Sequence, residues 1–369
     1  MTPKEPARNA EYLKIMNRRH ILGLLRRAPM SRIELAAGTG LTRAAITMIT
    51  REMIDEGLLS EGEASVRPGK GKHPIPLTIN PAAFIAAGVA LTRSGCTVGI
   101  ADLSGRLLAR RTLQISPPDG LVTIRDALRE LIAETGTSPL GIGISAPGPL
   151  DAARGTILNP PYFEAWHNTA AAPYLASSLN LPAYLEKDAS ALALWHLDRG
   201  CSRDFLLLLV DSGIGSGIVS DGRLFTSSGR FTSELGHITI RFDGKKCGCG
   251  NLGCLEAYAS IPNLLADAGC AHRAWREVID ADDTALIDRE AEYLAAGITT
   301  IRNLVNIDTV YLAGDIRYGF DRLAPRLMHR VSAQSMLKSP INILPAGEIA
   351  DIGVAAAANL VFSAHLSAE

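Results

Sequence analysis

Residues 232–260 read TSELGHITIRFDGKKCGCGNLGCLEAYAS and contain the most specific pattern in the chain. One histidine and three cysteines follow the spacing His-x9-Cys-x-Cys-x4-Cys, at His237, Cys247, Cys249 and Cys254. Thiolate sulfur and imidazole nitrogen suit tetrahedral zinc, and the glycines between the cysteines let the backbone turn so that the sulfurs converge. The pattern predicts one closed, structural Zn²⁺ site per chain. The alternative is three reduced cysteines in a glycine-rich loop.

The rest of the composition indicates a cytoplasmic protein. Cys96, Cys201 and Cys270 are scattered, so the cysteines predict a metal site and buried thiols rather than a disulfide framework. The sequence has no run of about 18 or more uncharged apolar residues, which a membrane span requires. The N-terminus, MTPKEPARNA, lacks the apolar segment of a secretory signal.

Strand and helix patterns alternate on both sides of the cysteine motif. Apolar runs with strand character cover 84–100, 140–148, 205–211 and 309–314, and a helical pattern covers 121–134. This alternation occurs twice along the chain, which favours a duplicated α/β fold. Because no close sequence repeat is visible, the duplication is inferred from the organisation alone.

Residues 11–80 carry the signals of a winged helix-turn-helix in the expected order. A helical pattern over 17–27 is followed by Ser31 and Glu34, which form a capping box at the start of a short helix. A Gly-Thr-Gly turn ends that helix, and Thr42 is a candidate N-cap for the next one. The second helix of such a pair enters the major groove of DNA by its N-terminal end.

The second helix is followed by a basic segment over 61–80 that is rich in glycine and proline. This composition predicts a wing that lies on phosphates or in the minor groove. In the second helix Ile46, Ile49 and Met53 share one face and are expected in the core, which leaves the other face for DNA. The alternative is a three-helix bundle with a flexible basic linker. The candidate DNA-binding residues are Arg32, Thr42, Arg43, Ala44, Thr47, Met48, Arg67, Lys70 and Lys72.

The charge distribution agrees with a head that meets a polyanion. Residues 1–80 hold 13 Lys and Arg against 8 Asp and Glu, whereas the remainder holds 24 against 30. The head therefore carries +5 and the body −6, which sum to the net charge of −1. A chain of 369 residues also exceeds the usual size of one hydrophobic core. We expect a DNA-binding domain over 1–80 and a second domain, with two lobes, over 81–369.

Five motifs in the body, in order, resemble those of the ROK family (repressors, open reading frames and kinases). Residues 17–80 are similar to the N-terminal domain of ROK repressors, although Gly-Lys-His-Pro stands where the family wing has Gly-Arg-x-Pro. The resemblance implies an actin-like, hexokinase-like (ribonuclease H-like) fold whose two lobes hold sugar and nucleotide in their cleft. The motifs are APGPLD (146–151), LPAYLEKDASALAL (181–194), VDSGIGSGIVSDGRLF (210–225), the segment 232–260 and, within it, GCLEAYAS (253–260).

The same resemblance implies a sugar site in the cleft. Carboxylates accept pairs of sugar hydroxyls, and His237 can serve both zinc and ligand, so that zinc orients the imidazole. Trp166 could stack on a sugar face or pack in the core, and Asp188 could instead be a surface residue at a helix N-terminus. The implied sugar-binding residues are Asp188, Glu234, His237, Glu256, Lys187, Trp166 and Asn168.

The resemblance fails where a kinase needs it. ROK kinases hold phosphates with an Asp-x-Gly-Gly-Thr-Lys loop, but residues 88–95 read GVALTRSG, without the acidic residue, the paired glycines or the lysine. Lys187 replaces the asparagine before the catalytic aspartate, so Asp188 is a vestigial base position and we predict no catalytic residues.

We therefore predict a sugar-responsive DNA-binding regulator, a repressor of carbohydrate uptake or catabolism genes. Because operator palindromes mirror protein symmetry, we expect a homodimer or a dimer of dimers on palindromic double-stranded DNA. The alternatives are an ATP-dependent sugar kinase with an added DNA-binding head, and a regulator that senses a partner protein.

Overall fold

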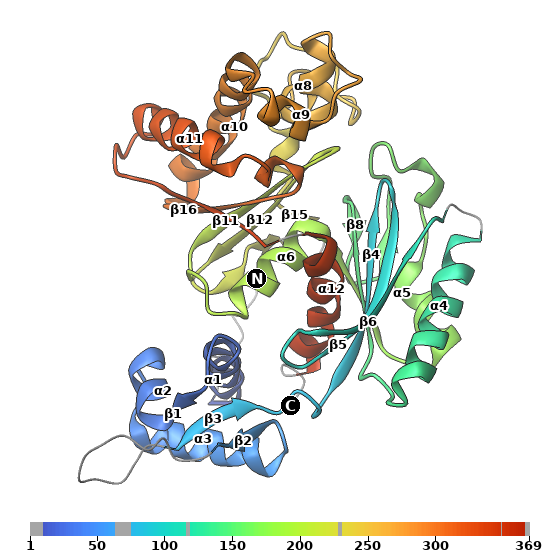
Figure 1. Ribbon diagram of the computed structural model, residues 1–369, viewed down its shortest axis with the longest axis vertical. Helices are drawn as coiled ribbons and strands as arrows, with labels where there is room; N and C mark the ends of the chain where they lie inside the picture. Colours follow the sequence, from blue (N-terminus) through green and yellow to red (C-terminus); the bar gives the residue numbers. More distant parts are fainter. Residues whose placement is uncertain (1–9, 63–74, 116–118, 228–230, 348, 366–369) are drawn as a thin grey trace, which may run out of the picture.

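A computed structural model describes residues 10–62, 75–115, 119–227, 231–347 and 349–365 (Figure 1). Within these residues no helix is long and apolar enough to cross a membrane. The predicted wing cations Arg67, Lys70 and Lys72 lie outside the described residues.

The N-terminal head combines three helices with a three-stranded antiparallel sheet in the order β1-β3-β2. Ser31 and Glu34 form the predicted capping box at the start of α2, and the Thr42 side chain accepts a hydrogen bond from the Ala45 amide at the start of α3. Gly40 has a φ of 73°, which provides the left-handed turn between the two helices. The elements are α1 (Ala10–Leu25), β1 (Met30–Ser31), α2 (Arg32–Thr39), α3 (Arg43–Asp55), β2 (Leu59–Glu61) and β3 (Pro76–Ile79).

The first lobe of the body is built on a five-stranded sheet in the order β10-β7-β4-β5-β6. Strands β4, β5 and β6 are antiparallel, whereas β7 and β10 run parallel to β4. Helices α4 and α5 pack against the sheet from one side, and α12 packs against β4 and β7 from the other. The elements are β4 (Ile85–Thr92), β5 (Gly95–Asp102), β6 (Leu107–Leu113), α4 (Gly120–Thr135), β7 (Ile142–Ala146), β8 (Leu150–Asp151), β9 (Thr156–Ile157), the 3₁₀ helix Glu164–Trp166, α5 (Ala171–Leu179) and β10 (Ala183–Lys187).

The second lobe repeats this topology with the order β13-β12-β11-β16-β17. An antiparallel hairpin, β11 and β12, is again followed by two parallel strands, so the duplication expected from the sequence is confirmed. The elements are α6 (Asp188–Leu197), β11 (Phe205–Val210), β12 (Ile214–Ser220), β13 (Arg223–Leu224), β14 (Thr226–Ser227), β15 (Phe231–Thr232), the 3₁₀ helix Leu235–His237, α7 (Glu256–Ala259), α8 (Ile261–Asp267), α9 (Trp275–Asp280), α10 (Thr284–Val305), β16 (Thr309–Ala313), the 3₁₀ helix Asp315–Arg317, α11 (Phe320–Gln334), β17 (Asn342–Pro345) and α12 (Ile349–His365).

Helices α6 and α12 pack against each other between the lobes, and α12 also supports the head (Figure 1). Val361 and Phe362 of α12 share one buried apolar cluster with Ile21 and Leu22 of α1. The Arg19 guanidinium donates to the carbonyl of Ser363. The proposed division between residues 80 and 81 falls between β3 and β4, but the head is packed against the body rather than separated from it.

Candidate functional site

A cavity of about 110 Å³ lies between the two lobes. Five of the seven predicted sugar-binding residues line it: Lys187, Asp188, Glu234, His237 and Glu256. The β4–β5 turn, the loop after β11 and the start of α12 complete the wall, through residues that include Thr92, Arg93, Asp211, Ser212, Gly213 and Gly353.

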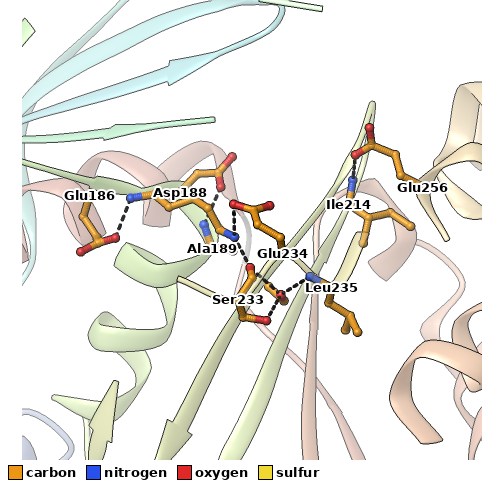
Figure 2. Close-up of polar contacts among 10 residues, drawn as sticks. Glu186, Asp188, Ala189, Ile214, Ser233, Glu234, Leu235 and Glu256 are labelled. Carbon is orange, nitrogen blue, oxygen red and sulfur yellow. Dashed lines mark hydrogen bonds and ion pairs between the residues drawn. The ribbon is translucent and has the colours of Figure 1, made fainter. Parts of the chain in front are cut away.

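Asp188 stands at the first turn of α6, directly after β10 brings the chain to the cavity. Its Oδ1 accepts a hydrogen bond of 2.7 Å from the Ala189 amide (Figure 2). Burial raises the pKa of Asp188 to about 6, although the positive charge of Lys187 opposes the shift. The carboxylate therefore changes its charge close to neutral pH.

Lys187 is buried and holds Glu234 in place. Its Nζ lies 3.3 Å from Glu234 Oε1 and donates to the carbonyl of Ser233. Gly148 makes room for the lysine stem, because a Cβ at that position would lie 2.9 Å from Lys187 Cδ. Lys187 therefore fixes the position of the Glu234 carboxylate at the cavity wall.

Glu256, the first residue of α7, presents one satisfied and one unsatisfied oxygen. Oε2 accepts a 2.7 Å hydrogen bond from the Ile214 amide (Figure 2). Oε1 is buried and has no hydrogen-bond partner among the described residues. A buried carboxylate oxygen without a donor is costly, so this atom is available for a ligand hydroxyl.

The predicted metal ligands converge. One ligand atom from each of His237, Cys247, Cys249 and Cys254 lies within 4.8 Å of the others, so the cluster could hold a metal ion. Gly253 has a φ of 71°, and a Cβ there would lie 1.5 Å from the Arg241 carbonyl oxygen, so this turn requires glycine. His237 belongs both to this cluster and to the cavity wall.

The structure does not bring Trp166 or Asn168 to the cavity wall. The Trp166 ring is 5% exposed, stacks on Phe163 with centroids 5.8 Å apart and packs against Gly120 of α4. It is a core residue, as the packing alternative allowed. Asn168 is exposed and has a φ of 55°. Its backbone N–H donates to the Leu158 carbonyl, which indicates a turn residue.

Arg93, Asp211 and Ser212 line the cavity but were not predicted. Thr92 and Gly95 pair at the end of the β4–β5 hairpin, so Arg93 sits in a tight turn within 88–95, the stretch that the sequence resemblance compares with the phosphate loop of ROK kinases. The signal in the sequence is an arginine within residues 88–95, the stretch that differs from the kinase phosphate loop.

The predicted DNA-binding face of α3 is exposed. Arg43, Ala44, Thr47 and Met48 surround a shallow depression, and Met48 is 60% exposed although it is apolar. Arg32 is different, because it is held within the head by Thr50 and Glu61, at 3.1 and 2.8 Å.

The ROK family model matches residues 86–363. The N-acetylglucosamine repressor of Escherichia coli O6:H1 is 28% identical over 374 residues, which cover 91% of this chain and 90% of the relative. A crystal structure of a ROK family transcriptional regulator, a homologue of the E. coli MLC protein, matches with a TM-score of 0.75 and 25% identity, over 96% of this chain and 98% of that one. The ROK hexokinase of Thermus thermophilus matches with a TM-score of 0.62 and 26% identity, over 74% of this chain and 97% of its own.

Proposed function

The chain belongs to the ROK family and to its transcriptional regulators, and from that premise we propose that a sugar in the lobe cleft controls operator binding by the winged head. The chain is a regulator and not an enzyme: the relatives that match almost all of it are transcriptional regulators, whereas the hexokinase covers 74% of it. We infer that the replaced phosphate loop, with Arg93 in its place, leaves no site for ATP.

The observation that carries this proposal is that one helix contacts both functional ends of the molecule. Gly353, near the start of α12, lines the cavity, and Ser363, near its end, binds Arg19 of the head. A ligand that prefers one lobe arrangement would therefore also favour one position of the head.

The sugar site that we propose consists of Asp188, Glu234, His237 and Glu256, with Lys187 as a positioning residue for Glu234. Carboxylates accept hydroxyl protons, and the free Oε1 of Glu256 supports this role. We propose that the metal is a structural Zn²⁺, one per chain, held by the His237 cluster, because three sulfurs and one imidazole suit tetrahedral zinc. Bound zinc would order the loop and orient the imidazole at the cavity wall.

On the DNA side we propose that Arg43, Ala44, Thr47 and Met48 meet the major groove, with Thr42 as the cap of α3. The wing residues Arg67, Lys70 and Lys72 would supply phosphate contacts. We further propose a homodimer or dimer of dimers on palindromic operators, which control genes for carbohydrate uptake or catabolism.

One experiment tests sugar binding in the cleft and operator binding by the head together. Fluorescence anisotropy of the full-length, zinc-loaded protein on operator DNA, titrated with a panel of sugars and sugar phosphates, should reveal at least one compound that changes operator affinity. The same compound should raise the melting temperature in the absence of DNA, because it binds the folded state. If no sugar changes either quantity while operator binding is intact, the effector is not a sugar and the proposal fails.

A further inference from the structure

Arg93 is a cation at the cavity wall whose hydrogen-bonding capacity is unused. Its side chain is 17% exposed, and the ion pair from Nη2 to Glu256 Oε1 is 4.0 Å long, beyond hydrogen-bond range. Among the described residues it donates no hydrogen bond, and its buried Nε has no partner. A weak cation–π contact, 5.6 Å from the Tyr162 ring centroid, does not replace these bonds. A guanidinium has five donors, and leaving them unpaired in a mostly buried place is costly.

The second cation of the cavity differs in this respect. Lys187 is 3% exposed and is already bound to the Ser233 carbonyl and the Glu234 carboxylate. The two cations therefore have different roles. Lys187 binds other residues of the protein, whereas the donors of Arg93 remain available to a ligand.

Glu256 complements Arg93 across the same cavity. Its Oε1 has no hydrogen-bond partner, so an unsatisfied acceptor and an unsatisfied cationic donor lie 4.0 Å apart. A sugar hydroxyl would satisfy the carboxylate. A carboxylate or phosphate on the same sugar would satisfy the guanidinium with paired, charge-assisted hydrogen bonds, which are stronger than those to a neutral oxygen.

We propose that the effector is an acidic monosaccharide, whose carboxylate or phosphate binds Arg93 while a neighbouring hydroxyl binds Glu256. This inference rests on the proposed function, since it names the class of sugar that the same cleft binds. Asp188, Asp211 and Glu234 also line the cavity and repel an anion, so the acidic group must bind directly to the Arg93 guanidinium, whose positive charge also acts on Asp188 and Asp211. Gly213 leaves room for this guanidinium, because a Cβ there would lie 2.0 Å from Arg93 Nη1 and displace it.

The experiment measures affinity by isothermal titration calorimetry on the full-length, zinc-loaded protein. For each of glucose, galactose and mannose, the neutral sugar is compared with its 6-phosphate and its uronate, and inorganic phosphate is a further probe. We expect at least one acidic member to bind on the order of tenfold or more tighter than its neutral parent. Whether the phosphate or the uronate is the tighter of the two identifies the source of the anion.

The variants test the residue. Arg93→Gln should remove the preference for the acidic member and leave weak binding of the neutral parent, while Arg93→Lys should retain part of the preference. The control Arg129→Gln removes an exposed charge on α4 away from the cavity and should change neither affinity.

The outcomes separate this inference from the proposed function. If a neutral sugar binds as tightly as its acidic forms, or Arg93→Gln keeps the preference, the inference is wrong and the sugar-responsive regulator stands. If inorganic phosphate binds as tightly as the acidic sugars, the anion alone is recognised and the inference is also wrong. If neither these sugars nor any member of the panel used on operator DNA binds the wild-type protein, the proposed function fails and the inference fails with it.

Discussion

Two basic residues face one cavity, and the difference between them shows why charge has to be judged together with its partners. Lys187 is buried and fully engaged, so its removal would leave Glu234 without a counterion and would alter the wall rather than the ligand. Arg93 has a similar charge and a similar place but makes no hydrogen bond to the described chain. Lys187 therefore stabilises the cavity wall, whereas Arg93 has donors that a ligand could use.

The metal cluster makes a prediction for one exposed cysteine. Cys249→Ser should lose the metal ion, because three of the four ligands cannot close a tetrahedral structural site. The zinc content of the purified variant, measured by elemental analysis, should fall from one ion per chain toward zero. The melting temperature should fall as well. Cys270→Ser, a cysteine outside the cluster, is the control and should retain zinc. Retention of one zinc per chain by Cys249→Ser would show that the ligand set is wrong.

The titration of Asp188 predicts how sugar affinity depends on pH. Since burial raises the pKa of Asp188 to about 6, the carboxylate is ionised above that value and protonated below it. The ionised form accepts ligand hydroxyls, so the affinity for a neutral sugar should fall as the pH decreases from 7 to 5, and the fall approaches about tenfold per pH unit only well below the pKa. Lys187 and Arg93 lower this pKa and Glu234 raises it, so all three set the midpoint.

Calorimetry between pH 5 and 8 measures this dependence, with the zinc content checked at each pH because metal affinity itself depends on pH. Asp188→Asn should bind more weakly and with a flatter profile. An unchanged profile in Asp188→Asn would assign the titration to another group.

At the scale of elements, α3 shows how local signals and burial divide one helix. The Thr42 cap and the buried stripe of Ile46, Ile49 and Met53 attach the helix to the head. The opposite face carries the exposed arginines and the apolar Met48. These side chains make no core contact and are free to meet a partner.

Arg43 lies at the start of this face, so its replacement tests whether α3 is the recognition helix. Arg43→Ala should weaken operator binding by about 1–3 kcal/mol if it contacts a base edge, and should relax specificity at that base. Anisotropy on the operator and on single-base variants measures both effects. Arg129→Ala controls for loss of one positive charge elsewhere. If affinity and specificity both stay at the wild-type level, α3 is not the recognition helix.

For the whole molecule, the connection between head and cleft runs through two helices. α6 begins with Asp188 in the cavity, and directly after its end the Asp198 carboxylate binds Asn359 and Ser363 of α12. The carbonyl of Asp198 faces Gly23 of α1, where a Cβ would lie 2.8 Å away. The junction is thus packed too closely to accept even one added methyl group without a shift.

Gly23→Ala tests this junction. The added Cβ should displace the head from the end of α6, so the sugar should change operator affinity less than in the wild-type protein, where about 5- to 150-fold is typical of such coupling. Operator titrations with and without the effector measure the ratio. Gly38→Ala, whose Cβ meets the side chain of Leu24 inside the head, is the control and should keep the wild-type ratio. Equal ratios in Gly23→Ala and the wild type would exclude this route of coupling.

Much of the molecule could be predicted because its signals are local. The capping box, the Thr42 cap and the His237 cluster each join residues close together in the sequence, so spacing alone indicates their geometry. The duplicated α/β order follows from apolar periodicity, which reports how each strand is buried.

What the sequence by itself determined about this protein is therefore its elements, its family and the His–Cys cluster that could hold a metal ion, since these depend on short-range spacing and on composition. The tertiary structure decided which side chains face the cleft. It placed Trp166 in the core, removed Asn168 from the wall and brought Arg93 beside Glu256, a residue 163 positions later in the chain. Contacts of such separation depend on how two lobes pack, and no local pattern contains that information.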